Sequence, residues 1–265
     1  MAKPLNIELP NGVQIPIVYE DHAVLAVDKP AGWMCAPPSW QQTGRNLQAA
    51  LESSVNHGDY WAKSRNLRYL RFVHRLDSDT SGILLLAKSA GALEALSELF
   101  QTRNVEKVYL AAVDGSVAAD EWVCSEPIGP MKGRKGVMQV DAAGGDAETR
   151  FKVLQRIKGR SLVEARPLTG RTHQIRVHLR AAGHPVLHDP IYGKASEKKE
   201  KLALRATKLV YRDPFRKKQV CVRAKVAKFI SGHGFEVRRP KNASASLNRR
   251  GGGEDSSSGL KDRSR

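Results

Sequence analysis

The sequence predicts an α+β fold built around one large, mainly antiparallel mixed sheet flanked by helices and loops. Short apolar runs typical of strands dominate, and helical patterns are interspersed among them without regular alternation. With 41% hydrophobic residues in a chain of 265, there are enough apolar side chains to fill a substantial core. We expect a single domain over residues 13–240, after a loose lead-in at 1–12 and before a disordered polar tail at 241–265.

Eight stretches have the composition of strands and are bounded by turn-forming residues. In chain order they lie at residues 13–18, 24–28, 83–87, 105–113, 149–156, 161–166, 202–211 and 220–226. The third stretch is apolar throughout and stands between Gly82 and Lys88. A short run of this kind is typical of a strand buried on both faces.

Three helices are expected between these strands, and each has a residue that can cap its first turn. Asn46 can cap a helix that runs to residue 55, and Ser89 can cap one that runs to about residue 103. Thr172 can cap a third helix, which Gly183 ends at the position after its C-cap.

Charge is the strongest feature of the composition. Forty-four Lys and Arg residues stand against 27 Asp and Glu residues, for a net charge of +17. Such a positive field favours polyanions, so nucleic acid and an anionic membrane surface are the candidate partners. No apolar run approaches a membrane span or a signal peptide, and we expect a soluble, cytoplasmic protein without a membrane partner. The three cysteines are far apart and form no CxxC pair, which argues against a structural zinc site.

Two irregular segments leave alternatives open. Residues 56–71 place Tyr60, Trp61 and Tyr69 among arginines, and such aromatic side chains either stack on unpaired bases or pack back on the core. Residues 114–145 contain PMKGRKG, which is either a hairpin that touches RNA or a solvated loop.

The chemistry-bearing stretch is FVHRLDSDTSGILLLAK, in which a polar loop leads directly into the apolar strand at 83–87. A strand buried on both faces holds such a loop still. The carboxylate of Asp77 can act there as nucleophile, general base or metal ligand, or it can cap the turn through the amides of Thr80 or Ser81. Spacing alone favours the turn-capping role.

Four collinear stretches resemble the RluA-type pseudouridine synthase family. The HRLDSDTSG loop resembles the signature loop of that family, and DKPAG at residues 28–32 its early strand and turn. KVYLA at 107–111 resembles the tyrosine-bearing strand, and RPLTGRTHQIRVH at 166–178, with the later GHP and DPIYG, its third motif. The resemblance spans about Tyr19 to Tyr211 and implies the pseudouridine synthase fold and the isomerisation of uridine in RNA.

The resemblance assigns the catalytic roles. Asp77 matches the catalytic aspartate, Tyr109 the active-site tyrosine, and Arg176 the basic residue that pairs with the aspartate. Such a pair would keep the aspartate ionised and aimed at the sugar. Asp79 is expected to bond to loop amides or a nearby arginine, outside the pocket. The reaction needs no cofactor, because it exchanges one base–sugar bond for another.

Contacts with RNA are expected from His74, Arg75, Arg171, His173 and Lys29. The resemblance implies that Arg75 fills the place of a flipped-out base, and Arg171 is expected to touch phosphate. No metal site is expected, because the chain has no HxH or HExxH spacing and His173 and His178 diverge on a helix.

The predicted partner is an rRNA or a tRNA substrate, and we expect a monomer with no obligate protein partner. Longer members of the family carry a small N-terminal RNA-binding domain, whereas here the first core strand pattern lies near the start of the sequence. A non-catalytic RNA-binding or RNA-folding module on the same scaffold is the alternative function. A metal-dependent nuclease that uses the His and Asp residues is the third hypothesis.

Overall fold

A computed structural model describes residues 2–9, 12–35, 45–194 and 200–237. The predicted tail at 241–265 lies outside these residues, so its disorder stays a prediction. No helix in the described ranges is long and apolar enough to cross a membrane.

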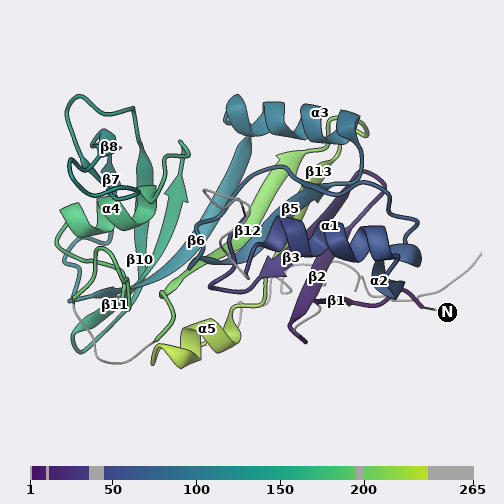
Figure 1. The fold of residues 1–265 in the computed structure, drawn as a ribbon. Helices are drawn as coiled ribbons and strands as arrows, with labels where there is room; N and C mark the ends of the chain where they lie inside the picture. The colour runs from purple at the N-terminus through teal and green to yellow at the C-terminus, as the bar shows by residue number, and fades with distance from the viewer. Residues whose placement is uncertain (1, 10–11, 36–44, 195–199, 238–265) are drawn as a thin grey trace, which may run out of the picture.

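One large sheet organises the molecule (Figure 1). Its strands follow the order β1-β2-β3-β5-β12-β6-β11-β10-β7, with β4 also paired to β5 and β13 to β12. They are β1 (Asn6–Glu8), β2 (Gln14–Glu20), β3 (Val24–Lys29), β4 (Arg71–Phe72), β5 (Ser81–Ala87), β6 (Val105–Asp114), β7 (Glu121–Cys124), β10 (Thr149–Ile157), β11 (Arg160–Pro167), β12 (Leu204–Arg212) and β13 (Gln219–Arg223). Among the described pairs of named strands, all are antiparallel except β5 with β12. The predicted α+β fold with a mainly antiparallel mixed sheet is confirmed.

Strand β5 lies inside the sheet and is buried on both faces, as its apolar run predicts. Leu84 and Leu86 belong to the core beneath α1 (Leu47–His57) and α2 (Tyr60–Lys63). Ile83, Leu85 and Ala87 point the other way, into the core beneath α3 (Ala90–Gln101). In Figure 1, α1 crosses in front of this part of the sheet and α3 runs along its upper edge. Because successive side chains of a strand alternate between faces, one apolar run serves both cores.

The second half of the sheet carries its own layer. Helix α4 (Gln174–Ala181) packs its Ile175 and Leu179 into a core formed with β6 and β11, and α5 (Ala227–Gly232) adds Ile230 to it. A separate antiparallel pair, β8 (Ile128–Pro130) and β9 (Met138–Val140), forms a hairpin that lies beside α4 (Figure 1). The PMKGRKG stretch therefore belongs to a hairpin, and the contact of this hairpin with RNA stays a prediction.

The capping predictions hold for two of the three helices. The side chain of Asn46 accepts a hydrogen bond from the amide of Ala49, and that of Ser89 from Ala92, both at 3.2 Å. Thr172 is not the cap of α4. His173 takes that place, with φ at 58° and no capping hydrogen bond from its side chain. Gly183 follows the C-cap with φ at 82°, as predicted.

One further prediction needs correction, and one open alternative is resolved in part. The lead-in expected to be loose contains β1, which pairs with β2 and buries Ile7 completely. Of the two alternatives left open for the aromatic residues of 56–71, packing on the core holds for Trp61, which is 4% exposed and whose indole donates to the hydroxyl of Ser54 at 2.7 Å. Tyr60 remains half exposed, so only part of the 56–71 segment packs on the core.

Candidate active site

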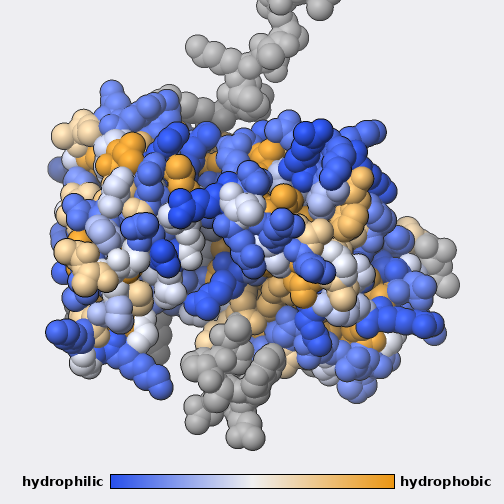
Figure 2. Space-filling view, turned by 90° about the horizontal axis from the view of Figure 1, so that it is seen from above, coloured by the Kyte–Doolittle hydropathy of each residue, from blue (hydrophilic) through white to orange (hydrophobic). Residues whose placement is uncertain are grey.

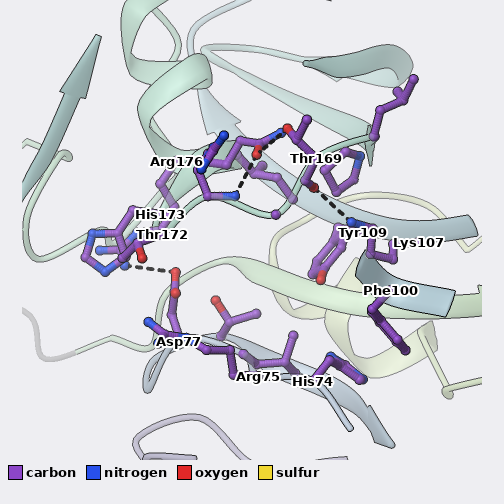
Figure 3. A pocket seen from close by; sticks show the side chains of 18 of the residues that line it. His74, Arg75, Asp77, Phe100, Lys107, Tyr109, Thr169, Thr172, His173 and Arg176 are labelled. Carbon is purple, nitrogen blue, oxygen red and sulfur yellow. Dashed lines mark hydrogen bonds and ion pairs between the residues drawn. The ribbon is translucent and has the colours of Figure 1, made fainter. Parts of the chain in front are cut away.

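A cavity of about 530 Å³ lies over β6 and contains all three predicted catalytic residues. Its walls come from four parts of the chain: the loop before β5, the end of α3, strand β6, and the segment that enters α4. Figure 3 shows Asp77, Arg75 and His74 along one wall, Thr172 and His173 beside Asp77, and Tyr109 with Lys107 on the far side. Residues far apart in the sequence thus converge on one pocket.

The loop that holds Asp77 is anchored at several points. The carbonyl of Asp77 accepts the amide of Thr80 at 3.2 Å, and the amide of Gly32 donates to the carbonyl of Ser78 at 2.8 Å. Gly82 has φ at 113°, and a Cβ there would collide with the carbonyl oxygen of Ala206 on β12. The parallel β5–β12 contact therefore requires glycine at the end of the loop that holds Asp77.

Lys29 is one of these anchors, and the prediction that it binds RNA is wrong. Its side chain is completely buried, and Nζ donates to the carbonyl oxygens of Pro30, Trp33 and Ser78 at 3.1, 2.8 and 2.8 Å. Burial lowers the pKa of Lys29 to about 8. All three donors of the ammonium group point into the protein, so Lys29 fixes the loop before Asp77.

Arg176 lies at the centre of a buried carboxylate–guanidinium cluster. Its Nε and Nη2 donate to Oδ2 and Oδ1 of Asp189 at 2.7 and 2.8 Å, in a two-pronged pair. Its Nη1 lies 3.4 Å from Oδ2 of Asp77. The side chains of Arg176 and Asp189 are 1% and 0% exposed, whereas that of Asp77 is 20% exposed. Asp189 therefore fixes the guanidinium, and the remaining nitrogen, Nη1, faces Asp77 at the wall of the cavity.

The charges of this cluster stabilise each other. Burial alone would raise the pKa of Asp189, but the hydrogen bonds and charge of Arg176 outweigh burial and hold that pKa below its usual value. Burial likewise disfavours the charged guanidinium, yet Asp189 and then Asp77 raise the pKa of Arg176 above its ordinary value. The pair therefore stays ionised inside the protein.

Tyr109 and Lys107 project from the same face of β6, two residues apart. Burial raises the pKa of the Tyr109 hydroxyl well above its ordinary value, and the negative charge of Asp77 adds to this effect. Lys107 donates to the carbonyl of Thr169 at 2.8 Å, and burial lowers its pKa to about 8. The side chain of Tyr109 thus lines the pocket as a neutral phenol near the carboxylate of Asp77.

Two histidines line the pocket in different ways. Nε2 of His74 accepts the amide of Leu85 at 3.1 Å, its ring stacks on Phe100, and burial lowers its pKa to about 4. His74 is therefore a structural hydrogen-bonder at the base of the loop, and its contact with RNA stays a prediction. Nδ1 of His173 lies 2.9 Å from the hydroxyl of Tyr192, and burial lowers the pKa of His173 as well.

Arg75 and Arg171 are exposed at the rim. The guanidinium of Arg75 makes no hydrogen bond or ion pair with any residue that the structure describes, which leaves it free for a ligand. Nε of Arg171 donates to the carbonyl of Asp146 at 2.9 Å, and its guanidinium packs against Gly145. Asp79 is outside the lining of the pocket, as expected. However, the described residues give it neither of the bonds expected for it.

Sequence reasoning missed Asp189 and Tyr192. Both lie in the DPIYG stretch, which was noted as a motif without a role. The signal was a buried arginine: a guanidinium predicted inside a pocket needs more than one acceptor, and Asp189 is the acidic residue that the third motif offers.

The arrangement of the histidines and acidic residues bears on the metal-dependent alternative. Within the described ranges, no group of three or more His, Cys, Asp or Glu residues is arranged to hold a metal ion. His178 bonds to the hydroxyl of Thr149 and the carbonyl of Glu126, both at 3.0 Å, away from the pocket. His173 and His178 therefore diverge, as their spacing predicts.

The fold and this site match known proteins. Residues 23–181 match the RNA pseudouridylate synthase family, and the chain belongs to that family. Asp77, Tyr109 and Arg176 all lie within the matched stretch, which confirms the resemblance seen in the sequence.

Three relatives show the extent of the likeness. Pseudouridylate synthase RPUSD2 of Homo sapiens is 45% identical over 182 residues, which cover 69% of this chain and 31% of that protein. Ribosomal large subunit pseudouridine synthase C of Haemophilus ducreyi is 38% identical over 179 residues, which cover 67% of this chain and 52% of that protein. The structure of human RNA Pseudouridylate Synthase Domain Containing 1 has a TM-score of 0.64 at 29% identity and covers 80% of this chain and 84% of its own. The chain thus spans about a third of the first of these relatives and about half of the second.

Proposed function

We propose that this protein is an isomerase that converts a uridine in RNA into pseudouridine, with Asp77 as the catalytic carboxylate. One observation carries the proposal: Asp77 stands at the wall of a cavity, 3.4 Å from an arginine that a second, buried carboxylate already holds. A fixed carboxylate beside a pocket large enough for a base is what the reaction requires.

The reaction is balanced without any co-reactant. The bond between C1′ of the ribose and N1 of uracil breaks, the base turns in the pocket, and a new bond forms between C1′ and C5. The proton on C5 leaves and N1 gains a proton, so substrate and product are isomers. Asp77 either attacks C1′ or removes a proton from the sugar, and both roles need an ionised carboxylate at the sugar. The buried walls hold the detached base away from water.

The other residues of the pocket have complementary roles in this proposal. The ring of Tyr109 packs on the target uracil, and its phenol hydroxyl is in reach of the base for proton transfer. The unbonded guanidinium of Arg75 takes the place of the flipped base, which offsets part of an unstacking cost of about a few kcal/mol. Arg171 at the rim contacts phosphate, and His74 and His173 shape the entrance.

The substrate is an RNA, either rRNA or tRNA. A net charge of +17 supports a polyanionic partner, and Figure 2 shows hydrophilic side chains over most of one face of the molecule. The names of the bacterial relatives favour RNA of the large ribosomal subunit over tRNA. We further propose that the protein acts as a monomer, in the cytoplasm and without an obligate protein partner.

Two experiments test the proposal. Pseudouridine is mapped in RNA from cells with and without the gene, and a site that disappears without the gene identifies the substrate. The purified protein is then assayed by tritium release from uracil-labelled RNA that contains this site. Asp77→Asn should abolish release and leave RNA affinity within about twofold, because it removes one charge at the pocket and no phosphate contact.

Asp79→Asn is the matched control, since it makes the same change two residues along the same loop. It should retain activity. An unchanged map, or an active Asp77→Asn protein, would refute the proposed function or the assigned carboxylate, respectively.

A further inference from the structure

The tip of the β8–β9 hairpin presents three exposed cations, Lys132, Arg134 and Lys135. The turn is ordered, because the amide of Met131 donates to the carbonyl of Val137 at 2.8 Å and that of Val137 to Arg134 at 3.1 Å. Within the described part of the chain, the three cations form no ion pair. They are therefore available to RNA phosphates, on an element that is separate from the main sheet.

The inner face of this hairpin rests on Tyr192. That side chain is 5% exposed and packs with Ile128 and Val137 of the hairpin and with Val177 of α4. The hydroxyl of Tyr192 also accepts the amide of Met138 on β9 at 2.9 Å. The hairpin is thus connected to Tyr192 through both apolar packing and a hydrogen bond.

Tyr192 is equally connected to the catalytic cluster. Its amide donates to Oδ1 of Asp189 at 3.0 Å, and Cζ of Arg176 lies over its ring, 5.1 Å from the centroid. Its hydroxyl lies 2.9 Å from Nδ1 of His173. The hydroxyl can accept from Met138 and still share a hydrogen bond with Nδ1 of His173, because a hydroxyl has one donor and two acceptor sites. Burial lowers the pKa of His173, which is consistent with a neutral ring.

We propose that Tyr192 is a positioning residue that couples the β8–β9 hairpin to the Asp77–Arg176 pair, so that RNA held at the hairpin tip aligns the catalytic groups. This inference rests on the proposed function, which it deepens. A shift of the hairpin moves the Met138 amide, and with it the tyrosine hydroxyl and the ring on which Arg176 lies. The 3.4 Å separation between Arg176 and Asp77 exceeds the roughly 2.8 Å of a charge-assisted hydrogen bond, so a small movement is enough to close it.

A double-mutant cycle tests the coupling. The tip variant replaces Lys132, Arg134 and Lys135 with alanine, Tyr192→Phe removes only the hydroxyl, and a fourth protein combines both changes. RNA affinity and the single-turnover rate at saturating enzyme are measured separately. The tip variant should bind more weakly, with a shallower salt dependence, and should also react more slowly. Tyr192→Phe should lower the rate about tenfold at unchanged affinity, which corresponds to about 1.4 kcal/mol and lies within the range of coupled contacts.

The combined protein decides the question. If Tyr192 transmits the effect of the tip, the combined protein should react no more slowly than Tyr192→Phe alone. Rate defects that multiply, or a Tyr192→Phe protein with the wild-type rate, would overturn the inference. Tyr19→Phe is the matched control: it removes a hydroxyl that donates to Asp21 at 2.9 Å, on strand β2 and outside the lining of the pocket, and should change neither rate nor affinity. A wild-type protein without turnover would overturn the proposed function and this inference together, whereas multiplying defects in an active protein would overturn the inference alone.

Discussion

The substitution Asp189→Asn tests what the buried carboxylate contributes to stability and, separately, to turnover. The asparagine keeps one oxygen, which can still accept the amides of Ile191 and Tyr192 and the Nη2 of Arg176. Its amide nitrogen replaces the oxygen that lies 2.7 Å from Nε of Arg176, so two donors face each other there. The change thus leaves a guanidinium that is 1% exposed with half of its main partner gone.

The cost follows from this geometry. Removing one partner of a buried ion pair destabilises a protein by about 3 to 5 kcal/mol. Because most of the hydrogen bonds to the remaining oxygen survive, we expect the lower end, a loss of about 3 kcal/mol in the free energy of unfolding. For a domain of this size, that loss lowers the melting temperature by roughly 6 to 12 °C. Turnover should fall about 10- to 100-fold in the protein that remains folded, since Arg176 is no longer fixed toward Asp77.

Urea unfolding, thermal melting and tritium release measure these quantities. Asp77→Asn is measured for comparison. The carboxylate of Asp77 is 20% exposed, and its contact with Arg176 is long, at 3.4 Å, so its loss should lower the free energy of unfolding by less than about 1 kcal/mol while abolishing turnover. An Asp189→Asn protein as stable as the wild type would show that Arg176 is not held by a buried charge pair. A fully active one would show that fixing Arg176 is unnecessary for the reaction.

Three further predictions concern the pocket. Arg75→Ala should lose turnover on structured RNA and recover most of it on a short RNA whose target uridine is already unpaired; an equal defect on both would place Arg75 in the chemical step. His74, whose pKa of about 4 lies below its ordinary value near 6.5, is neutral in the folded protein, so its contribution to stability is complete above pH 6.5 and lost as the pH falls toward 4. His74→Gln keeps an acceptor for the Leu85 amide and should remove roughly 3 kcal/mol of that pH dependence in urea titrations; an unchanged slope would mean that another group takes up the proton. Turnover should persist in EDTA once the RNA is shown to stay folded, and a loss restored only by a transition metal would revive a metal-dependent mechanism.

Local signals in the sequence predicted much of the molecule. The apolar run at 83–87 became β5 because a strand buried on both faces needs no polar alternation. Asn46 and Ser89 cap their helices, since a cap depends only on the next few residues. The four motifs likewise located Asp77, Tyr109 and Arg176, and the structure places all three at one pocket.

The failures arose where a side chain's role depends on distant neighbours. Lys29 lies in a recognisable motif, but its direction is set by three carbonyls, one of them from Ser78, 49 residues away in the chain. Thr172 is of a residue type that often caps helices, yet α4 begins one residue later, with His173 as its N-cap. Neither outcome can be read from the residues within one turn of these positions.

The sequence by itself therefore determined the family and the mixed sheet, and it located the three residues predicted to be catalytic, because these follow from patterns carried by contiguous residues. Only the tertiary structure decided how those residues are held. Asp189 meets Arg176 across 13 residues, and Tyr192 meets Met138 across 54. Such partners are brought together by the packing of α4 and the hairpin, and in a low-dielectric interior that packing selects which charges pair and which hydroxyls bond.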